Sequence, residues 1–141
     1  ITTRLVGSEM CIRDRYHITQ ESKYMDKAKQ VINYAATSDR CLRNGILRDE
    51  GSSMDQSIFK SVYIPYAVNL ALDEASSSIG KHLITFLKNN AETLRMNLNH
   101  AAYPAMYCNY WWGEMWKSSE PASMGAQVSG ASLMEGIARL E

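Results

Sequence analysis

The sequence has 141 residues, of which 45% are hydrophobic and 21% charged, so the chain can fold around a hydrophobic core. Its 15 basic and 15 acidic residues balance, which argues against nucleic acid as a partner. No apolar run approaches the roughly 20 residues of a membrane-spanning helix. The three scattered cysteines, Cys11, Cys41 and Cys108, form neither a disulfide framework nor a zinc motif, and the sequence leaves open whether Cys41 and Cys108 pair.

The first fifteen residues differ from the rest of the chain. They read ITTRLVGSEMCIRDR, show little helical periodicity and are followed by a clear amphipathic pattern. Residues 5–15 of this stretch resemble translated sequencing-adaptor sequence. We therefore expect residues 1–15 to be a non-native segment and residues 16–141 to form the domain. The alternative is a natural polar extension.

The first predicted helix begins at Thr19 as its N-cap and extends to about Ala36. Its apolar residues recur at helical spacing and are Tyr24, Ala28, Val31, Ile32 and Ala35. The polar stretch that follows, residues 37–54, contains two glycines and is predicted to be a loop, in which residues 46–49 are briefly extended.

Asp55 is predicted to cap a second helix, in which Pro65 should cause a kink or an early break. Its apolar positions are Ile58, Phe59, Val62, Tyr66, Ala67 and Leu70. Ser78 is predicted to cap a third helix. Its core positions are Leu83, Phe86, Leu87, Ala91, Leu94 and Leu98.

A long loop over residues 99–122 precedes a final helix. The predicted core face of that helix consists of Val128, Ala131, Met134, Ile137 and Ala138. No segment alternates clearly enough to be a sheet strand. The sequence therefore predicts an all-α fold of stacked helical hairpins, with functional loops collected at one end.

Four motifs in order resemble glycoside hydrolase family 76, the α-1,6-mannanase family. They are DEGSSMDQSIFKSVYIPYAVNLA from Asp49, FLKNNAETL from Phe86, YCNYWWGEMW from Tyr107, and GAQVSGASLMEGIA from Gly125. The sequence departs from the family pattern at Pro65 and Arg95. These departures affect the local shape of the cleft.

The resemblance implies that residues 16–141 are the C-terminal helical hairpins of an incomplete (α/α)6 toroid, without its N-terminal hairpins. It further implies a polysaccharide or oligosaccharide substrate, α-1,6-linked mannan or related mannose-containing glycans, and a secreted, periplasmic or cell-surface location. No cofactor, metal or membrane span is expected. Fungal relatives are cell-wall transglycosidases, and MDQSIFK and GAQVSGASL lean slightly toward that branch. The alternative function within the family is therefore a transglycosidase that acts on cell-wall or anchor glycans.

Glycoside hydrolysis requires two carboxyl groups on either side of the scissile bond. The catalytic pair of the family is two adjacent aspartates in its N-terminal half, and this sequence contains no Asp-Asp. Asp49 and Glu50 are a poor substitute, because neighbouring side chains of an extended segment point to opposite faces. We therefore expect the parent protein to be a glycosidase and this chain to contribute no catalytic residue.

The family resemblance places Asp55, Gln56, Phe59 and Lys60 at the substrate-binding cleft. Asp55 has two compatible interpretations, a helix cap and a hydrogen-bonding partner of sugar hydroxyls. For Lys60 the alternatives are a side chain that reaches solvent along the helix and a donor in the cleft. Phe59 also fits the helical core pattern.

The aromatic loop is the strongest indication of a binding site that comes from the residues themselves. All three tryptophans, Trp111, Trp112 and Trp116, lie within six residues, and flat amphipathic rings suit sugar faces. The alternative is that the rings fill space between helix ends. We expect this loop and Asp55 to share one concavity, although a noncatalytic helical module that binds a glycan or protein also fits the residues.

Overall fold

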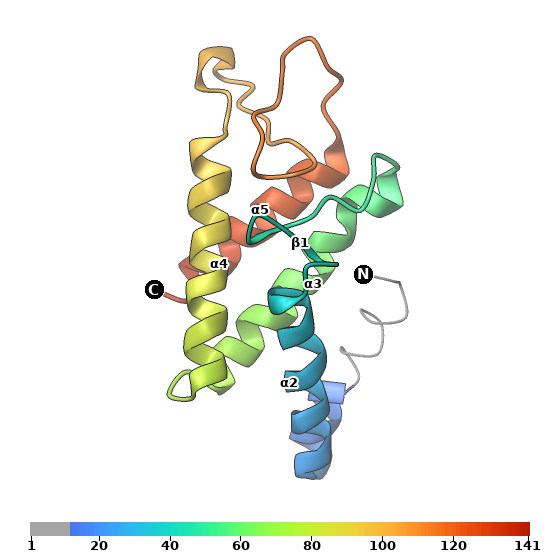
Figure 1. Ribbon diagram of the computed structural model, residues 1–141, viewed down its shortest axis with the longest axis vertical. Coiled ribbons are helices and arrows are strands. Elements are labelled where there is room, and N and C mark those ends of the chain that lie inside the picture. Colours follow the sequence, from blue (N-terminus) through green and yellow to red (C-terminus); the bar gives the residue numbers. More distant parts are fainter. Residues whose placement is uncertain (1–11) are drawn as a thin grey trace.

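The computed structural model describes residues 12–141, which are mostly helical (Figure 1). The helices are residues 12–19, α2 (Ser22–Thr37), α3 (Met54–Asp73), α4 (Ser78–Met96) and α5 (Met124–Ala138), with a short 3-10 helix η1 (His100–Ala102). The segments β1 (Leu42–Arg43) and β2 (Ile46–Leu47) pair antiparallel. The all-α prediction is confirmed, and the brief extended segment after residue 45 is one half of this small ladder.

The helix α2 starts at Ser22 with Glu21 as its N-cap, so the predicted cap at Thr19 is wrong. The Thr19 hydroxyl donates to the Arg15 carbonyl at 2.8 Å inside the preceding helical segment. Gln20 then takes a left-handed conformation, with φ of 57°, which separates the two helical segments. The buried residues of α2 are Met25, Ala28, Val31, Ile32, Ala35 and Ala36, whereas Tyr24 is half-buried.

The predicted caps of α3 and α4 are each displaced. Ser53 caps α3 in a capping box with Gln56, and Asp55 lies in the first turn, where a negative charge suits the helix dipole. The helix α3 continues through Pro65 to Asp73, so the early break does not occur. Ser77, one residue before the predicted Ser78, caps α4 and accepts a hydrogen bond from the Gly80 amide at 3.2 Å.

The core follows the apolar pattern of the sequence in α4, whereas in α3 only Ala67 and Leu70 of the six predicted apolar positions are buried. The predicted core face of α3 is therefore wrong for Ile58, Phe59, Val62 and Tyr66, which are half-buried. Five predicted α4 residues are buried, namely Leu83, Phe86, Leu87, Ala91 and Leu94. Asn90 is also buried, and its side chain accepts from the Leu47 amide at 3.0 Å while donating to the Phe86 carbonyl at 2.9 Å. This amide therefore ties the small ladder to α4 and satisfies buried polar groups on both.

The helices α3 and α5 run parallel and make the most extensive helix contact in the described structure, through small residues. A Cβ at Gly125 would lie 2.1 Å from the Ser57 Oγ, and one at Gly136 would lie 2.8 Å from a Val68 methyl. Between these positions the Ser129 hydroxyl donates to the Ser57 carbonyl at 2.8 Å. The two backbones therefore approach closely along the whole contact.

The predicted core face of α5 is wrong. Four of its members, Val128, Ala131, Met134 and Ala138, are exposed, and Ile137 is half-buried. The buried residues are Gly125, Ala126, Ser129, Gly130, Leu133 and Gly136. Close packing on α3 selects small side chains, which leaves the larger apolar side chains on the opposite, outer face.

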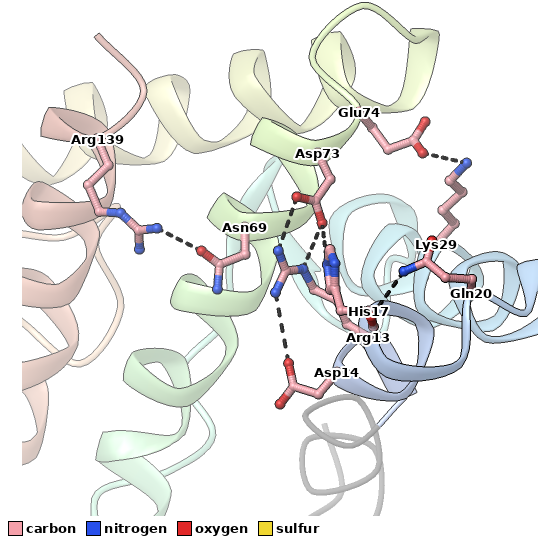
Figure 2. A network of polar contacts seen from close by, with 9 residues as sticks. All are labelled: Arg13, Asp14, His17, Gln20, Lys29, Asn69, Asp73, Glu74 and Arg139. Atoms are coloured by element: carbon pink, nitrogen blue, oxygen red, sulfur yellow. Dashed lines mark hydrogen bonds and ion pairs between the residues drawn. The ribbon is translucent and has the colours of Figure 1, made fainter.

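Polar contacts hold the C-terminal end of α3, as Figure 2 shows. Asp73 accepts hydrogen bonds from Arg13 at 2.8 Å, and the His17 ring nitrogen lies 3.3 Å from the same carboxylate. Two further contacts join this end to its neighbours, Lys29 with Glu74 at 2.7 Å and Arg139 with Asn69 at 2.7 Å. This end of α3 is thus linked to residues 12–19, α2 and α5.

Arg13 belongs to the segment that the sequence predicts to be non-native, and the boundary at residue 16 remains a prediction. Tyr16, the first residue after it, packs against the core. Cys11 and the rest of residues 1–11 lie outside the described residues. Among the helices that are described, none has the length and apolar character needed to cross a membrane.

Candidate functional site

The long connections gather at the N-terminal ends of α3 and α5, as the sequence predicts (Figure 1). The Ser123 hydroxyl, at the start of α5, donates to the Ser57 Oγ in the first turns of α3 at 3.2 Å. The segment between α4 and α5, residues 97–123, rises above these ends. Asp55, Lys60 and the aromatic residues therefore belong to the same end of the helix array.

The segment Tyr107–Trp116, here named the tryptophan loop, is anchored to α5 through Gln127. The Cys108 amide donates to the Gln127 Oε1 at 3.0 Å, and the Gln127 Nε2 donates to the Cys108 carbonyl at 2.9 Å. Cys108 also pairs with Met115 in an antiparallel bridge that closes the loop on itself. One side chain of α5 therefore fixes both backbone groups of Cys108.

Lys60 links α3 to the tryptophan loop. Its side chain is buried, with 3% of its surface exposed, and its ammonium donates to the Tyr110 carbonyl at 2.5 Å. The same nitrogen lies 4.1 Å from the centre of the Trp112 ring. Burial lowers the pKa of Lys60 to about 8, because a charged ammonium is poorly solvated there, while the carboxylates of Asp49 and Glu50 act in the opposite direction.

The three tryptophan rings are mostly enclosed. Trp112 is 1% and Trp116 7% exposed, and Trp111 is half-buried beneath the Arg43 guanidinium, which lies 4.1 Å from its ring centre. The indole nitrogens of all three are buried, and none has a hydrogen-bond partner among residues 12–141. Tyr107, which is 38% exposed, packs edge-on against Trp116 and presents an aromatic ring to solvent.

The other predicted binding residues lie on the first turns of α3. Asp55 is exposed, Gln56 forms the capping box with Ser53, and Phe59 is half-buried. A glycan-binding role for Asp55, Gln56, Phe59, Lys60, Trp111, Trp112 and Trp116 remains a prediction. A concavity shared by Asp55 and the tryptophans also remains a prediction. The structure places Asp55 and the tryptophans at the same end of the helix array.

Two pockets lie against α4 and α5. One, of about 180 Å³, borders the tryptophan loop at Cys108 and Gln127 and is otherwise lined by apolar side chains that include Leu94, Leu98 and Met106. The other, of about 420 Å³, has Met134 and Ile137 beside Lys88, Glu92 and Arg95. Neither pocket is lined by a predicted site residue.

Cys41 and Cys108 are both buried free thiols, which answers the pairing question that the sequence left open. Burial raises the pKa of each thiol, since the thiolate is poorly solvated in the interior. Within residues 12–141, no group of three His, Cys, Asp or Glu side chains is arranged to hold a metal ion.

Sequence reasoning did not identify the residues that hold the loop. Gln127 lies in the last of the four family motifs with no role assigned to it, and the sequence offers for Lys60 only a solvent-reaching or a cleft position. Both contacts join residues 19 or 50 positions apart, so no local pattern shows them. The only indication in the sequence is that Lys60 lies beside apolar helix positions, where a lysine is unusual.

The structure matches that of the glycoside hydrolase family 76 α-1,6-mannanase from Salegentibacter sp. HEL1_6. The TM-score is 0.79 at 27% sequence identity, over 89% of this chain and 36% of the mannanase. The chain is similar to part of a family 76 α-1,6-mannanase. It spans about a third of that enzyme's length, and the predictions of a family 76 resemblance and of a portion of an (α/α)6 domain are confirmed.

Other solved structures extend this comparison. An inactive variant of the same mannanase, with two aspartates replaced, was determined in complex with α-1,6-mannotetrose and matches at 28% identity with a TM-score of 0.79, over 89% of this chain and 36% of that one. The Lin0763 protein from Listeria innocua matches 96% of this chain and 35% of its own, at 26% identity with a TM-score of 0.78. Protein-family models and curated proteins gave no match.

Proposed function

We propose that this chain is the substrate-binding portion of a glycoside hydrolase that acts on α-1,6-linked mannan or related mannose-containing glycans. The observation that carries the proposal is the match, over 89% of the chain, to a mannanase whose inactive variants bind α-1,6-mannotetrose and α-1,6-mannotriose. At 26–28% identity the backbone arrangement is retained while most side chains differ.

The end of the helix array that carries the loops supports a glycan site. Sugar sites combine a few fixed polar groups with aromatic rings. Asp55 supplies an exposed carboxylate on α3, and Tyr107 supplies a partly exposed ring on a loop that Gln127 and Lys60 hold in place. These groups give the chain both components of such a site at one end.

The chain supplies binding rather than hydrolysis in this proposal. Bond cleavage requires a pair of carboxyl groups, and the inactive mannanase variants were made by replacing two adjacent aspartates. The 141 residues contain no adjacent aspartates. Asp49 and Glu50 lie in the irregular stretch between β2 and α3.

The outer face of α5 supports the view that further helical hairpins belong to the same domain. Met124, Val128 and Met134 are exposed at helical spacing on this face. Large apolar side chains in such a row are typical of a helix that packs on both sides. In the proposal, the N-terminal hairpins of the parent domain cover this face.

The test is calorimetric titration of the chain with α-1,6-mannotetraose, with the α-1,4-linked glucose tetramer as the control ligand. We expect selective binding of the mannose oligomer and no released sugar on prolonged incubation. Equal binding of both ligands, or no binding, contradicts the substrate assignment. Hydrolysis contradicts the absence of catalytic residues and directs attention to Asp49, Glu50 and Asp55.

A matched pair of tyrosine variants locates the site. Tyr107→Ala removes a partly exposed ring from the tryptophan loop, and Tyr34→Ala removes an exposed ring from α2. We expect only Tyr107→Ala to weaken mannotetraose binding. If the two variants bind equally well, the loop end is not the glycan site.

A further inference from the structure

Lys60 occupies a position where lysine is rarely found. Lysine side chains are seldom fully buried unless their charge is compensated, yet Lys60 is 3% exposed on the buried face of α3. It shares that face with Ser57, Tyr63 and Ile64, which are also buried. A burial this complete calls for specific contacts to the charge.

Two contacts to the ammonium lead to the same short segment. The nitrogen donates to the Tyr110 carbonyl at 2.5 Å and lies 4.1 Å from the centre of the Trp112 ring. A hydrogen bond from an ionised donor and a cation over an indole face are each stronger than their neutral counterparts, especially away from water. The charge of Lys60 therefore bears directly on two residues of the tryptophan loop.

The charged and titratable groups around this site come from three other segments. Asp49 and Glu50, just before α3, carry negative charge that favours the ammonium. Cys108, on the loop, has a thiol whose pKa is raised by burial. Arg43, on β1, lies over the Trp111 ring rather than the Trp112 ring. Each of the two neighbouring indoles thus has a different cation over its face.

We propose that Lys60 is a positioning residue whose buried ammonium holds the tryptophan loop against α3, in place of a direct contact with the glycan. Loss of the Lys60 proton ends the cation–ring contact with Trp112, whereas the neutral amine can still donate to the Tyr110 carbonyl, so the surroundings of the Trp112 ring change as Lys60 titrates. The positioning role is independent of the proposed function. Its consequence for mannan binding rests on that function.

All three tryptophans of the sequence lie in this loop, so tryptophan emission reports on the loop alone. The experiment follows emission and acrylamide quenching of the chain from pH 7 to pH 9.5. We expect a transition with a midpoint near the Lys60 pKa of about 8. Lys60→Met, similar in length and uncharged, should show no transition and stronger quenching throughout. Lys60→Arg stays charged over this range and should also show no transition.

Lys88→Met is the matched control, because Lys88 is exposed on α4 and its loss should leave the transition unchanged. The proposal is overturned if the unsubstituted chain shows no transition, or if the transition persists in Lys60→Arg, which would assign it to another group such as Cys108. It is also overturned if folded Lys60→Met has the quenching of the parent chain. If circular dichroism shows that Lys60→Met is unfolded, the proposal is still tested by the presence of the pH transition in the parent chain and its absence in Lys60→Arg.

Failure of the proposed function gives a different result. A chain that shows the Lys60 transition but binds no mannotetraose retains the positioning role and loses the glycan assignment. A chain that binds mannotetraose without any such transition retains the glycan assignment and loses the positioning role.

Discussion

The two ends of α3 are held by opposite means. Near its N-terminal end, a single buried ammonium, that of Lys60, contacts a carbonyl and a ring of the tryptophan loop. At its C-terminal end, Asp73 pairs with Arg13 and His17. Glu74 pairs with Lys29, and the side chains of all these pairs are partly exposed. The second end has more ion pairs, whereas the first combines one buried charge with neutral hydrogen bonds from Ser123 and Ser129 to Ser57.

The comparison indicates that burial, more than the number of charged contacts, decides how strongly a charge acts. Ion pairs in contact with water contribute roughly 0–1 kcal/mol and are screened by salt. A buried charge carries a desolvation cost of several kcal/mol, so the removal or neutralisation of that charge changes stability much more. Of four substitutions, ordered by expected size, the first and the last test this contrast, and the other two compare neutral contacts near the loop.

The largest effect should come from Lys60 and should depend on pH. The folded-state pKa of about 8 lies below the value of 10.5 for an exposed lysine. Between these values the unfolded chain binds more protons, so the Lys60 contribution to stability rises with pH there and is level below pH 8. Relative to Lys60→Met, the parent chain should gain up to about 3 kcal/mol in unfolding free energy from pH 7 to pH 10.5.

Urea unfolding of both proteins at several pH values measures this difference. The buried thiols and the tyrosines are common to both proteins, so their titration cancels in the comparison. Parallel curves for the parent chain and Lys60→Met would show that the folded-state pKa of Lys60 is not lowered.

The next largest effect should come from the α3–α5 contact at the loop end. Gly125→Ala places a methyl group 2.1 Å from the Ser57 Oγ and 3.1 Å from the Met54 carbonyl oxygen, so the Ser57 side chain must move and the α3 backbone is crowded as well. Overpacking of this kind lowers stability by about 2 kcal/mol. Gly136→Ala is the matched control, because the new methyl group first meets a side-chain methyl of Val68. Thermal unfolding should rank Gly125→Ala below Gly136→Ala, and the reverse order would contradict a tighter contact at the loop end.

A somewhat smaller effect should follow from Gln127→Leu. This change removes both hydrogen bonds to the Cys108 backbone, and the loss of partners for these groups should lower stability by about 1–2 kcal/mol. The tryptophan emission should also shift to longer wavelength. Gln30→Leu, at an exposed site on α2, serves as the control. Unchanged emission in folded Gln127→Leu would mean that Gln127 does not fix the loop.

The smallest effect should come from the polar end of α3. Asp73→Asn weakens the contacts with Arg13 and His17 and should lower stability by less than about 1 kcal/mol, with a smaller loss at high salt. Removal of residues 1–15 should have an effect of similar size if that segment is non-native. A loss of several kcal/mol in chemical denaturation would show that the segment is an integral part of the fold.

Helix positions with strong amphipathic spacing were predictable from the sequence. In α4 the apolar residues recur every three or four positions and are flanked by charges, so Leu83, Leu87 and Leu94 could be assigned to the core. Cap positions were less predictable, because several Ser, Thr and Asp residues compete near each start. Ser53 rather than Asp55 caps α3, since the Gln56 side chain completes a box with it.

The orientation of α5 and the environment of Lys60 were not predictable in this way. Hydrophobicity favours Val128 and Met134 for the core, whereas packing on α3 uses Gly125, Ser129 and Gly136 because they allow a close approach. The burial of Lys60 depends on a loop fifty residues later in the chain. The residues that the sequence proposes for the site lie at one end of the helix array, while the residues that hold its loop emerged only from tertiary contacts.

The small side chains between α3 and α5 also have a thermodynamic consequence. Glycine and alanine have no side-chain rotamers to lose, so the contact through Gly125, Ala126 and Gly136 forms with little loss of side-chain entropy. The entropy cost of docking α5 therefore comes mainly from ordering the backbone of the connection between α4 and α5, residues 97–123. The hydrogen bonds from Gln127 and Lys60 restrain this connection. They therefore reduce the backbone entropy that the connection would gain if α5 separated from α3, and so favour the docked helix.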